Sequence, residues 1–253
     1  MLMPRVMPCL LLKNGALVKT VKFKDPGYIG DPINAIRIYN EKEVDELIFL
    51  DISATLEKRE PPYKVLSEIA SECFMPVTYG GGVRDVETIR KILSLGIEKV
   101  AINSYAVENQ EFIRVAADKF GSSTIVVSID ARKKMFGRYE VFIHGGKKST
   151  GLDPVEFASA MEAMGAGEIL LTAIDRDGTQ EGYDLDLIKK VTEAVNVPVV
   201  ACGGAGKLDD FRLAVKEASA SACAAGSMVV YFGRNRAVLI TFPEREKLEE
   251  VLK

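Results

Sequence analysis

Short apolar stretches alternate along the chain with longer segments in which apolar residues recur every three or four positions. The first pattern is typical of buried strands and the second of amphipathic helices. Strands are predicted at residues 6–11, 47–51, 75–79, 99–102, 124–129, 169–172, 197–201 and 221–224. Helices are predicted at residues 32–42, 62–73, 85–94, 110–120, 154–164, 185–194, 208–217 and 244–251. Eight strand–helix units in 253 residues predict one (β/α)8 barrel, the TIM barrel fold.

An internal repeat favours this architecture. Pro76 and Pro198 each begin a strand that ends in glycines, and they lie 122 positions apart. Glu46 and Glu168 begin two more matching strands at the same spacing. The repeat predicts half-barrels over residues about 1–121 and 122–253, joined without a linker in a single domain. A doubly wound sheet is the alternative, but its glycine-rich turn follows the first strand rather than the third and seventh.

The two glycine clusters, at residues 80–82 and 203–204, are candidate phosphate sites. Glycines let the backbone approach an anion, and a following helix start offers N–H groups and a positive dipole end. For each cluster taken alone, a tight turn is the competing interpretation. Their duplication favours phosphate, and it predicts two anion pockets on opposite sides of the barrel mouth.

Two further segments are expected at the mouth. Residues 135–151 alternate in polarity and contain Gly145-Gly146, which predicts a β-ribbon. Residues 17–30 are interpreted as a long loop whose lysines close over an anionic ligand, while Phe23 and Tyr28 exclude water. A solvated basic loop is the alternative.

Composition narrows the function classes. The net charge of −3 is not typical of a nucleic-acid or membrane surface, and no apolar run is long enough to span a bilayer. The first five residues lack a signal-peptide pattern, so a cytoplasmic location is expected. The four cysteines form no Cys-x-x-Cys pair and are interpreted as small buried residues. With one histidine in the chain, no metal site and no cofactor are predicted.

The predicted strand ends present one clear candidate for proton transfer. Asp130 follows an apolar strand at the mouth, where partial loss of solvent raises a carboxyl pKa toward the working pH. A surface-loop aspartate is the alternative. The repeat places Leu11 where a mirrored acid would stand, so these positions offer no second carboxylate.

Motifs over nearly the whole chain resemble the HisF family, the cyclase subunit of imidazole glycerol phosphate synthase. They lie at residues 8–10, 49–52, 79–84, 99–104, 167–172, 175–179 and 203–206. The resemblance implies a barrel that forms a heterodimer with a HisH-like glutaminase and receives ammonia along its axis. It also implies two aspartates that act as acid and base on a substrate phosphorylated at both ends.

The resemblance assigns roles residue by residue. Asp130 matches one catalytic aspartate, and Leu11 matches the other. The substrate and phosphate site is assigned to positions that match the family's site and to the glycine clusters. These residues are Lys19, Asp51, Gly81, Gly82, Asn103, Ser104, Thr172, Asp177, Gly203, Gly204, Gly226 and Ser227. A charged ring where ammonia enters is implied for Arg5, Glu46, Lys99 and Glu168. A buried salt-bridge network that closes the barrel is the other interpretation of this ring, and the two are compatible.

The tail at residues 233–243 departs from the ordinary cyclase ending. With residues 23–26 and 30–34, it is similar to a sibling group implicated in converting an acetamido group of a sugar to an acetamidino group, with a glutaminase and a third protein. Three hypotheses follow: an ammonia-dependent synthase subunit for a phosphorylated sugar or sugar nucleotide, the histidine-pathway cyclase, or a non-catalytic glutaminase activator that conducts ammonia.

Overall fold

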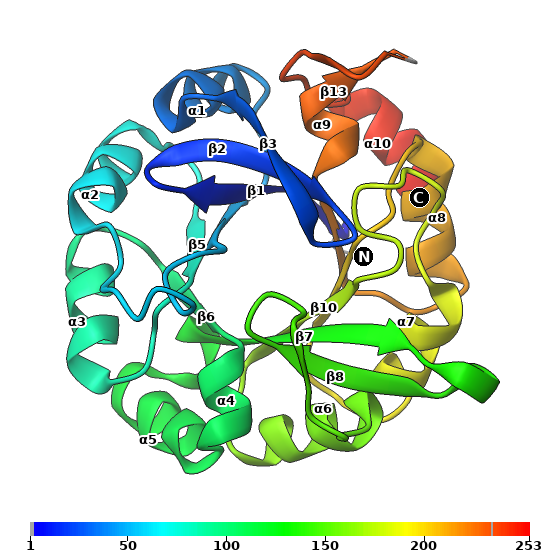
Figure 1. The fold of residues 1–253 in the computed structure, drawn as a ribbon. Coiled ribbons are helices and arrows are strands. Elements are labelled where there is room, and N and C mark those ends of the chain that lie inside the picture. The colour runs from blue at the N-terminus through cyan, green and yellow to red at the C-terminus, as the bar shows by residue number, and fades with distance from the viewer. Residues whose placement is uncertain (1–2, 234) are drawn as a thin grey trace.

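The computed structural model describes residues 3–233 and 235–253 as a closed barrel. Within these residues, eight parallel strands pair in a ring that closes between the last strand and the first (Figure 1). The strands are β1 (Arg5–Lys13), β4 (Leu47–Asp51), β5 (Val77–Gly80), β6 (Lys99–Ile102), β7 (Ile125–Lys133), β10 (Glu168–Ala173), β11 (Val199–Cys202) and β12 (Ala222–Ala225). The chain is therefore a TIM barrel, as the sequence predicts.

Helices surround the barrel (Figure 1). Those that the periodicity predicts are α1 (Pro32–Glu41), α2 (Tyr63–Glu72), α3 (Val86–Ser94), α5 (Glu111–Phe120), α6 (Pro154–Ala163), α7 (Leu185–Thr192), α8 (Leu208–Lys216) and α10 (Arg245–Leu252). Two short helices, α4 (Ser104–Glu108) and α9 (Ser227–Val230), were not predicted, because a single turn is too short to show a period. They begin directly after β6 and β12, at the mouth.

The prediction of a loop at residues 17–30 is wrong. The segment forms an antiparallel hairpin of β2 (Ala16–Val21) and β3 (Lys24–Gly30), and β2 also pairs with β1. The turn from β1 to β2 is Asn14-Gly15, with φ of 53° and 78°. Asn-Gly is the preferred pair for such a two-residue turn, so this signal was present in the sequence. The second turn uses Lys22 and Phe23 at φ of 53° and 63°, a pair without that signal.

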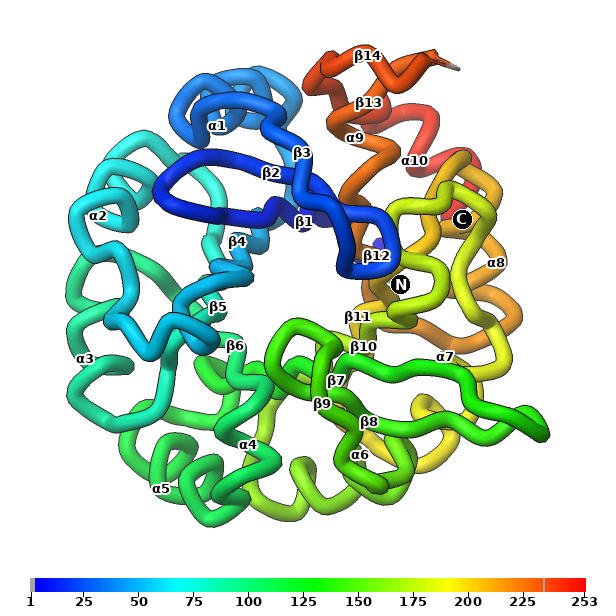
Figure 2. The backbone as a smooth tube through the Cα atoms, in the orientation of Figure 1, coloured from blue at the N-terminus to red at the C-terminus, as the bar shows by residue number. Residues whose placement is uncertain are grey.

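The predicted ribbon at residues 135–151 is confirmed. β8 (Tyr139–Ile143) pairs antiparallel with the extended end of β7 and with β9 (Lys148–Ser149). Figure 2 shows the β2–β3 hairpin and the turn after β8 at the rim of the barrel opening. A last small hairpin, β13 (Tyr231–Phe232) and β14 (Ala237–Val238), belongs to the tail. Met1, Leu2 and Arg234, which belong to the start and tail discussed above, lie outside the described residues.

Two apolar layers hold the barrel. The larger layer packs strands against helices, and the smaller one fills the barrel interior with side chains such as Met7, Ile48, Leu170 and Val200. Cys9, Cys202 and Cys223 are buried as expected, whereas Cys73 is only partly buried, and all four are free thiols. No helix among the described residues has the length and apolar character needed to cross a membrane.

Candidate active site at the barrel mouth

A cavity of about 1050 Å³ opens at the carboxyl ends of the strands. The thirteen residues predicted for catalysis or for substrate and phosphate binding all line it: Lys19, Asp51, Gly81, Gly82, Asn103, Ser104, Asp130, Thr172, Asp177, Gly203, Gly204, Gly226 and Ser227. Apart from Lys19, which lies on the hairpin strand β2, they come together because the carboxyl ends of parallel strands all lie at one end of a barrel. Their functional roles stay predictions.

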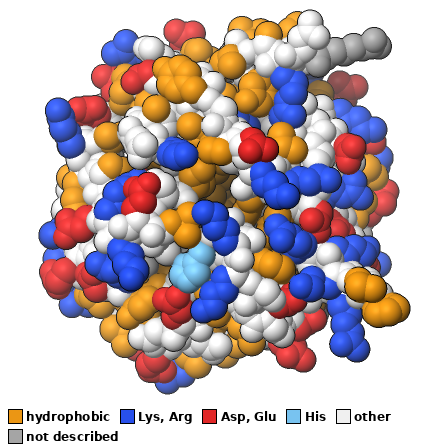
Figure 3. Space-filling model, viewed as in Figure 1, with side chains coloured by type: hydrophobic (Ala, Val, Ile, Leu, Met, Phe, Trp, Pro, Cys, Tyr) orange, Lys and Arg blue, Asp and Glu red, His pale blue; other side chains and the backbone are white. Residues whose placement is uncertain are grey.

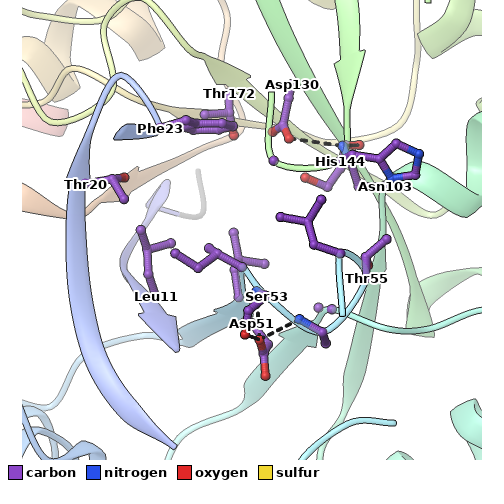
Figure 4. A pocket seen from close by; sticks show the side chains of 18 of the residues that line it. Leu11, Thr20, Phe23, Asp51, Ser53, Thr55, Asn103, Asp130, His144 and Thr172 are labelled. Atoms are coloured by element: carbon purple, nitrogen blue, oxygen red, sulfur yellow. Dashed lines mark hydrogen bonds between the residues drawn. The ribbon is translucent and has the colours of Figure 1, made fainter. Parts of the chain in front are cut away.

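Asp130 lies on β7 with its carboxyl in the cavity (Figure 4). Asn103 Nδ2 donates to Asp130 Oδ2 at 3.2 Å, which orients the carboxyl. Loss of solvent raises the pKa of Asp130 to about 7, the nearby Asp177 carboxylate adds to the rise, and a hydrogen bond with Thr172 partly offsets it. A carboxyl that titrates near neutral pH can both accept and return a proton.

Leu11 lines the same cavity from β1. It pairs with Leu50, and Asp130 pairs with Thr172, which lies 122 positions after Leu50. The sheet register thus places Leu11 and Asp130 on corresponding rungs of the predicted half-barrels. One rung carries a carboxyl and the other an alkyl side chain.

Asp51 is buried and its oxygens are occupied. Arg59 Nη2 donates to Oδ2 at 2.7 Å and to Oδ1 at 2.8 Å, and the N–H groups of Ser53 and Ala54 donate to Oδ1 at 3.0 Å. The same arginine donates from Nε to Glu57. Asp51 therefore anchors the loop after β4 through Arg59. The sequence did not identify Arg59 as a site residue, because the composition of a loop does not show which of its cations will pair with an aspartate at the strand end.

Lys19 and Asp177 form a buried ion pair. Lys19 Nζ donates to Asp177 Oδ1 at 2.8 Å, and Thr20 donates to the other oxygen at 3.1 Å. Lys22 N donates to the Asp177 carbonyl, so the β2–β3 hairpin is tied to the loop after β10. Other cations that line the cavity make no salt bridge to described residues: Lys13, Lys24, Lys58, Arg84 and Lys147. Figure 3 shows basic side chains gathered around the hollow.

Carboxylates occupy one N–H group in the first turn of α3 and two N–H groups just before α8, so these groups are not free to bind an anion. Asp85 accepts from Thr88 N at 2.7 Å, and Asp210 accepts from Gly206 N and Lys207 N at 2.8 and 3.0 Å. Gly81 is required by its surroundings, since a Cβ there would lie 2.6 Å from the Asp51 carbonyl oxygen. The unpredicted helices α4 and α9 instead bring Ser104 and Ser227 to the cavity directly after their strands.

Two hairpins meet over the mouth. A Cβ on Gly146, in the turn after β8, would lie 3.0 Å from Phe23 Cδ2 at the tip of the β2–β3 hairpin. Phe23 lines the cavity, whereas Tyr28 is 70% exposed and does not line it. The exclusion of water by Phe23 stays a prediction. His144, which was not predicted as a site residue, lies at the rim with Nε2 3.3 Å from Glu108 Oε1. Its position next to Gly145-Gly146, in the turn of a ribbon predicted to lie over the mouth, could have indicated that it is a site residue.

The four residues of the predicted charged ring lie at the amino ends of the strands, opposite the mouth. Arg5 binds Glu46 and Glu168, and Lys99 Nζ lies 3.1 Å from Glu46 and 3.0 Å from Glu168. The glutamates are buried and each bridges both cations, so the ring is closed and its formal charges cancel. Among the described residues, no group of three His, Cys, Asp or Glu side chains is arranged to hold a metal ion.

Comparison with known proteins identifies the family. A family model described as "Histidine biosynthesis protein" matches residues 5–235. A Pseudomonas aeruginosa protein named "Putative imidazole glycerol phosphate synthase subunit hisF2" is 53% identical over 97% of this chain and 98% of its own length. The Leptospira interrogans protein "Putative imidazole glycerol phosphate synthase subunit HisF" is 48% identical over 98% of both chains. The chain belongs to the HisF-like histidine biosynthesis family.

A third HisF-like relative, "Putative imidazole glycerol phosphate synthase subunit hisF3" of Vibrio vulnificus, is 44% identical over the whole of this chain and 97% of its own. All three matches span barrel and tail together. This HisF-like chain is therefore similar to synthase subunits along its entire length, and the family resemblance seen in the motifs is confirmed.

Proposed function

We propose that this chain is the cytoplasmic, ammonia-using subunit of a glutamine-dependent synthase, and that a HisH-like glutaminase is its heterodimeric partner. The names of its relatives refer to subunits of imidazole glycerol phosphate synthase, which supports a multi-subunit enzyme. The glutaminase docks at the amino ends of the strands, beside the charged ring of Arg5, Glu46, Lys99 and Glu168. Ammonia released there enters the barrel through this ring.

The barrel interior supports such a path. Between ring and mouth lie inward-facing side chains that are apolar and often small, including Ala101, Ala222 and Ala224. Neutral ammonia passes an apolar passage more readily than ammonium, because burying a charge without a partner costs on the order of several kcal/mol or more. Small local motions of the ring admit ammonia and exclude water and ions. The path ends at the cavity that holds Asp130.

At the mouth, ammonia meets a phosphorylated sugar or sugar nucleotide. The cations without carboxylate partners attract an anionic ligand, and the glycine and serine turns on two sides of the cavity approach its phosphates. In the proposed reaction the ammonia nitrogen forms a bond to the acetamido carbon and the C–O bond breaks, which gives an acetamidino sugar for surface polysaccharide such as O-antigen. The oxygen leaves as water, or as a phosphate or nucleotide when the third enzyme has first activated it with a nucleoside triphosphate. Asp130 accepts a proton from the attacking ammonia. A third enzyme that activates the amide is part of this proposal.

The observation that carries this choice is Leu11 on the rung that corresponds to Asp130. The cyclase reaction uses an acid and a base on opposite sides of the substrate, and the described cavity holds a carboxyl on one of the two rungs. A reaction with one principal proton-transfer step fits this site better. The histidine-pathway cyclase, which converts PRFAR and ammonia to imidazole glycerol phosphate and AICAR, is the alternative. The second alternative is a non-catalytic glutaminase activator and ammonia conduit.

A reconstitution experiment separates these functions. The purified chain and its co-expressed glutaminase are incubated with glutamine and either PRFAR or acetamido sugar nucleotides, with and without the candidate third enzyme. Mass spectrometry detects exchange of the acetamido oxygen for an imino group. Amidination that is lost in Asp130→Asn supports the proposal. Turnover of PRFAR at a rate normal for a cyclase contradicts it, and amidination undiminished in Asp130→Asn assigns the chain a conduit role.

A further inference from the structure

Two serines occupy equivalent positions in the predicted halves of the barrel. Ser104 begins α4 and Ser227 begins α9, and both line the cavity. The residues before them, Asn103 and Gly226, have nearly the same backbone angles, with φ −111° and ψ −88° in one and φ −106° and ψ −84° in the other. The two serines are therefore presented to the cavity by the same turn of backbone.

Their hydrogen bonds differ. Ser104 Oγ accepts from His144 N at 3.0 Å and donates to Asn103 Oδ1 at 3.2 Å, so its hydroxyl proton is occupied. Ser227 Oγ accepts from Arg236 Nη2 at 3.2 Å, and its own proton has no acceptor among the described residues. Gly226 has no side chain to supply one. The Ser227 hydroxyl is thus polarised by a cation and free to donate to a ligand.

Arg236 comes from the turn between β13 and β14, in the tail that departs from the ordinary family ending. Its Nη2 also donates to the Gly178 carbonyl at 3.0 Å, and its guanidinium carbon lies 4.8 Å from the centre of the Tyr231 ring. Its Nε and Nη1 groups have no hydrogen-bond partner in residues 3–233 and 235–253. A guanidinium fixed in this way is suited to bind two oxygens of a phosphoryl group.

The other cation beside Ser227 is already neutralised. A Cβ on Gly226 would lie 2.9 Å from Lys19 Cε, so this lysine passes directly beside the turn. Its ammonium, however, is paired with Asp177 at 2.8 Å. Arg236 makes no salt bridge to the described residues, so the cation that donates directly to Ser227 keeps an uncompensated positive charge. At the equivalent serine, the corresponding contact comes from an uncharged backbone N–H.

We propose that Arg236 makes the side of the mouth at Ser227 the stronger of the two anion pockets, where the dianionic phosphoryl end of the ligand binds. The inference rests on the proposed function, in that the mouth binds a phosphorylated ligand. The pocket at Ser104 holds the less charged end. Arg236 is a binding and specificity residue that acts beside Ser227, and the tail hairpin serves to bring its guanidinium to that serine.

Isothermal titration calorimetry of the full chain with inorganic pyrophosphate tests this. Arg236→Gln weakens pyrophosphate binding about tenfold or more, which equals about 1.4 kcal/mol, and Arg236→Lys has an intermediate effect. The matched control is Arg212→Gln, which removes one exposed arginine charge on α8, and it leaves the Kd unchanged within about twofold. Thermal melts of each variant show whether the barrel has remained folded.

A double-mutant cycle locates the effect. Ser227→Ala adds little to Arg236→Gln, because both changes remove the same pocket, whereas Ser104→Ala has the same effect in either background. If Arg236→Gln binds pyrophosphate as Arg212→Gln does, the inference is wrong and the proposed function stands. If the unaltered chain binds neither pyrophosphate nor phosphate, the anion pockets of the proposed function are themselves wrong.

Discussion

Asp130 and Leu11 stand on corresponding rungs of the barrel and point into one cavity (Figure 4). Asp130 carries a carboxyl whose pKa lies near 7 because the cavity wall removes solvent from it. Leu11 is 9% exposed and carries no ionisable group. The barrel therefore has two equivalent positions for a proton-transfer group, and one of them carries a carboxyl. This asymmetry can be tested by removing the carboxyl of Asp130 and by introducing one at Leu11.

Replacing Asp130 by asparagine removes the proton acceptor while keeping the size and the contact with Asn103. We expect ammonia-dependent product formation by the complex to fall by about 10²–10⁴-fold, the usual contribution of a general base. Glutaminase activity of the bound partner should persist, because the change is at the opposite end of the barrel from its docking face. Equal product formation in parent and variant would remove Asp130 from the mechanism.

The pKa of Asp130 predicts a pH profile. As a base, the carboxyl must be ionised, so the rate should rise with pH up to about 7 and then level off. The measurement keeps the concentration of neutral ammonia constant at each pH, since ammonia itself titrates. A profile without an inflection between about pH 6 and 8, roughly one pH unit on either side of the pKa, would contradict this role.

The same pKa has a consequence for stability. Its ordinary value of 3.8 applies in the unfolded chain, and the folded value is about 7. The native state binds the proton more tightly, so ionising Asp130 costs stability as pH rises from about 4 to 7. Asp130→Asn should therefore gain stability over the parent on going from pH 5 to pH 8, on the order of 2 kcal/mol after allowing for cavity water, or roughly 5 °C in Tm. Thermal melts at both pH values measure this difference.

Leu11→Asp places a carboxyl on the rung that corresponds to that of Asp130. We expect the variant, with its glutaminase, to form imidazole glycerol phosphate from PRFAR at a measurable rate, because the remaining predicted site residues already line the cavity. Leu11→Asn is the matched control, with similar shape and no ionisable group, and should form none. Both changes should cost about 1–3 kcal/mol of stability through burial of a polar group. No product with Leu11→Asp would mean that other site residues have diverged as well.

The sequence predicted the barrel well because its eight strand–helix units are regular. The short apolar runs of the strands and the three-to-four-residue recurrence of apolar positions in the helices are both strong. The positions of Asp130, Thr172 and the glycine clusters followed from the rule that strand ends share one end of a barrel. Contacts between loops did not follow. The hairpin turn at Lys22-Phe23 and the bond from Arg236 to Ser227 depend on tertiary packing rather than on local propensity, and a period cannot reveal them.

Arg59 should control the order of the loop after β4. It donates to Asp51, Glu57 and the Glu60 carbonyl, and the Asp51 side chain is buried. Arg59→Lys keeps the charge but cannot reproduce the planar fork, so we expect a loss of about 1–2 kcal/mol and a higher KM with a smaller change in kcat. Melting curves and steady-state kinetics measure the two effects. Unchanged KM would show that this loop does not shape the ligand site.

The ring at the amino ends of the strands offers a test that separates stability from ammonia transfer. Lys99→Met leaves Glu46 and Glu168 with one cation between them, and because these carboxylates are buried the loss should be about 3 kcal/mol. Lys247→Met, which removes an exposed lysine paired with Glu244, should cost less than about 1 kcal/mol. The ring also lies on the proposed ammonia path, so glutamine-dependent product formation should fall more than formation from added ammonia, which enters at the mouth. If both activities fall equally while the melts show the expected loss, the ring closes the barrel without serving as an entrance.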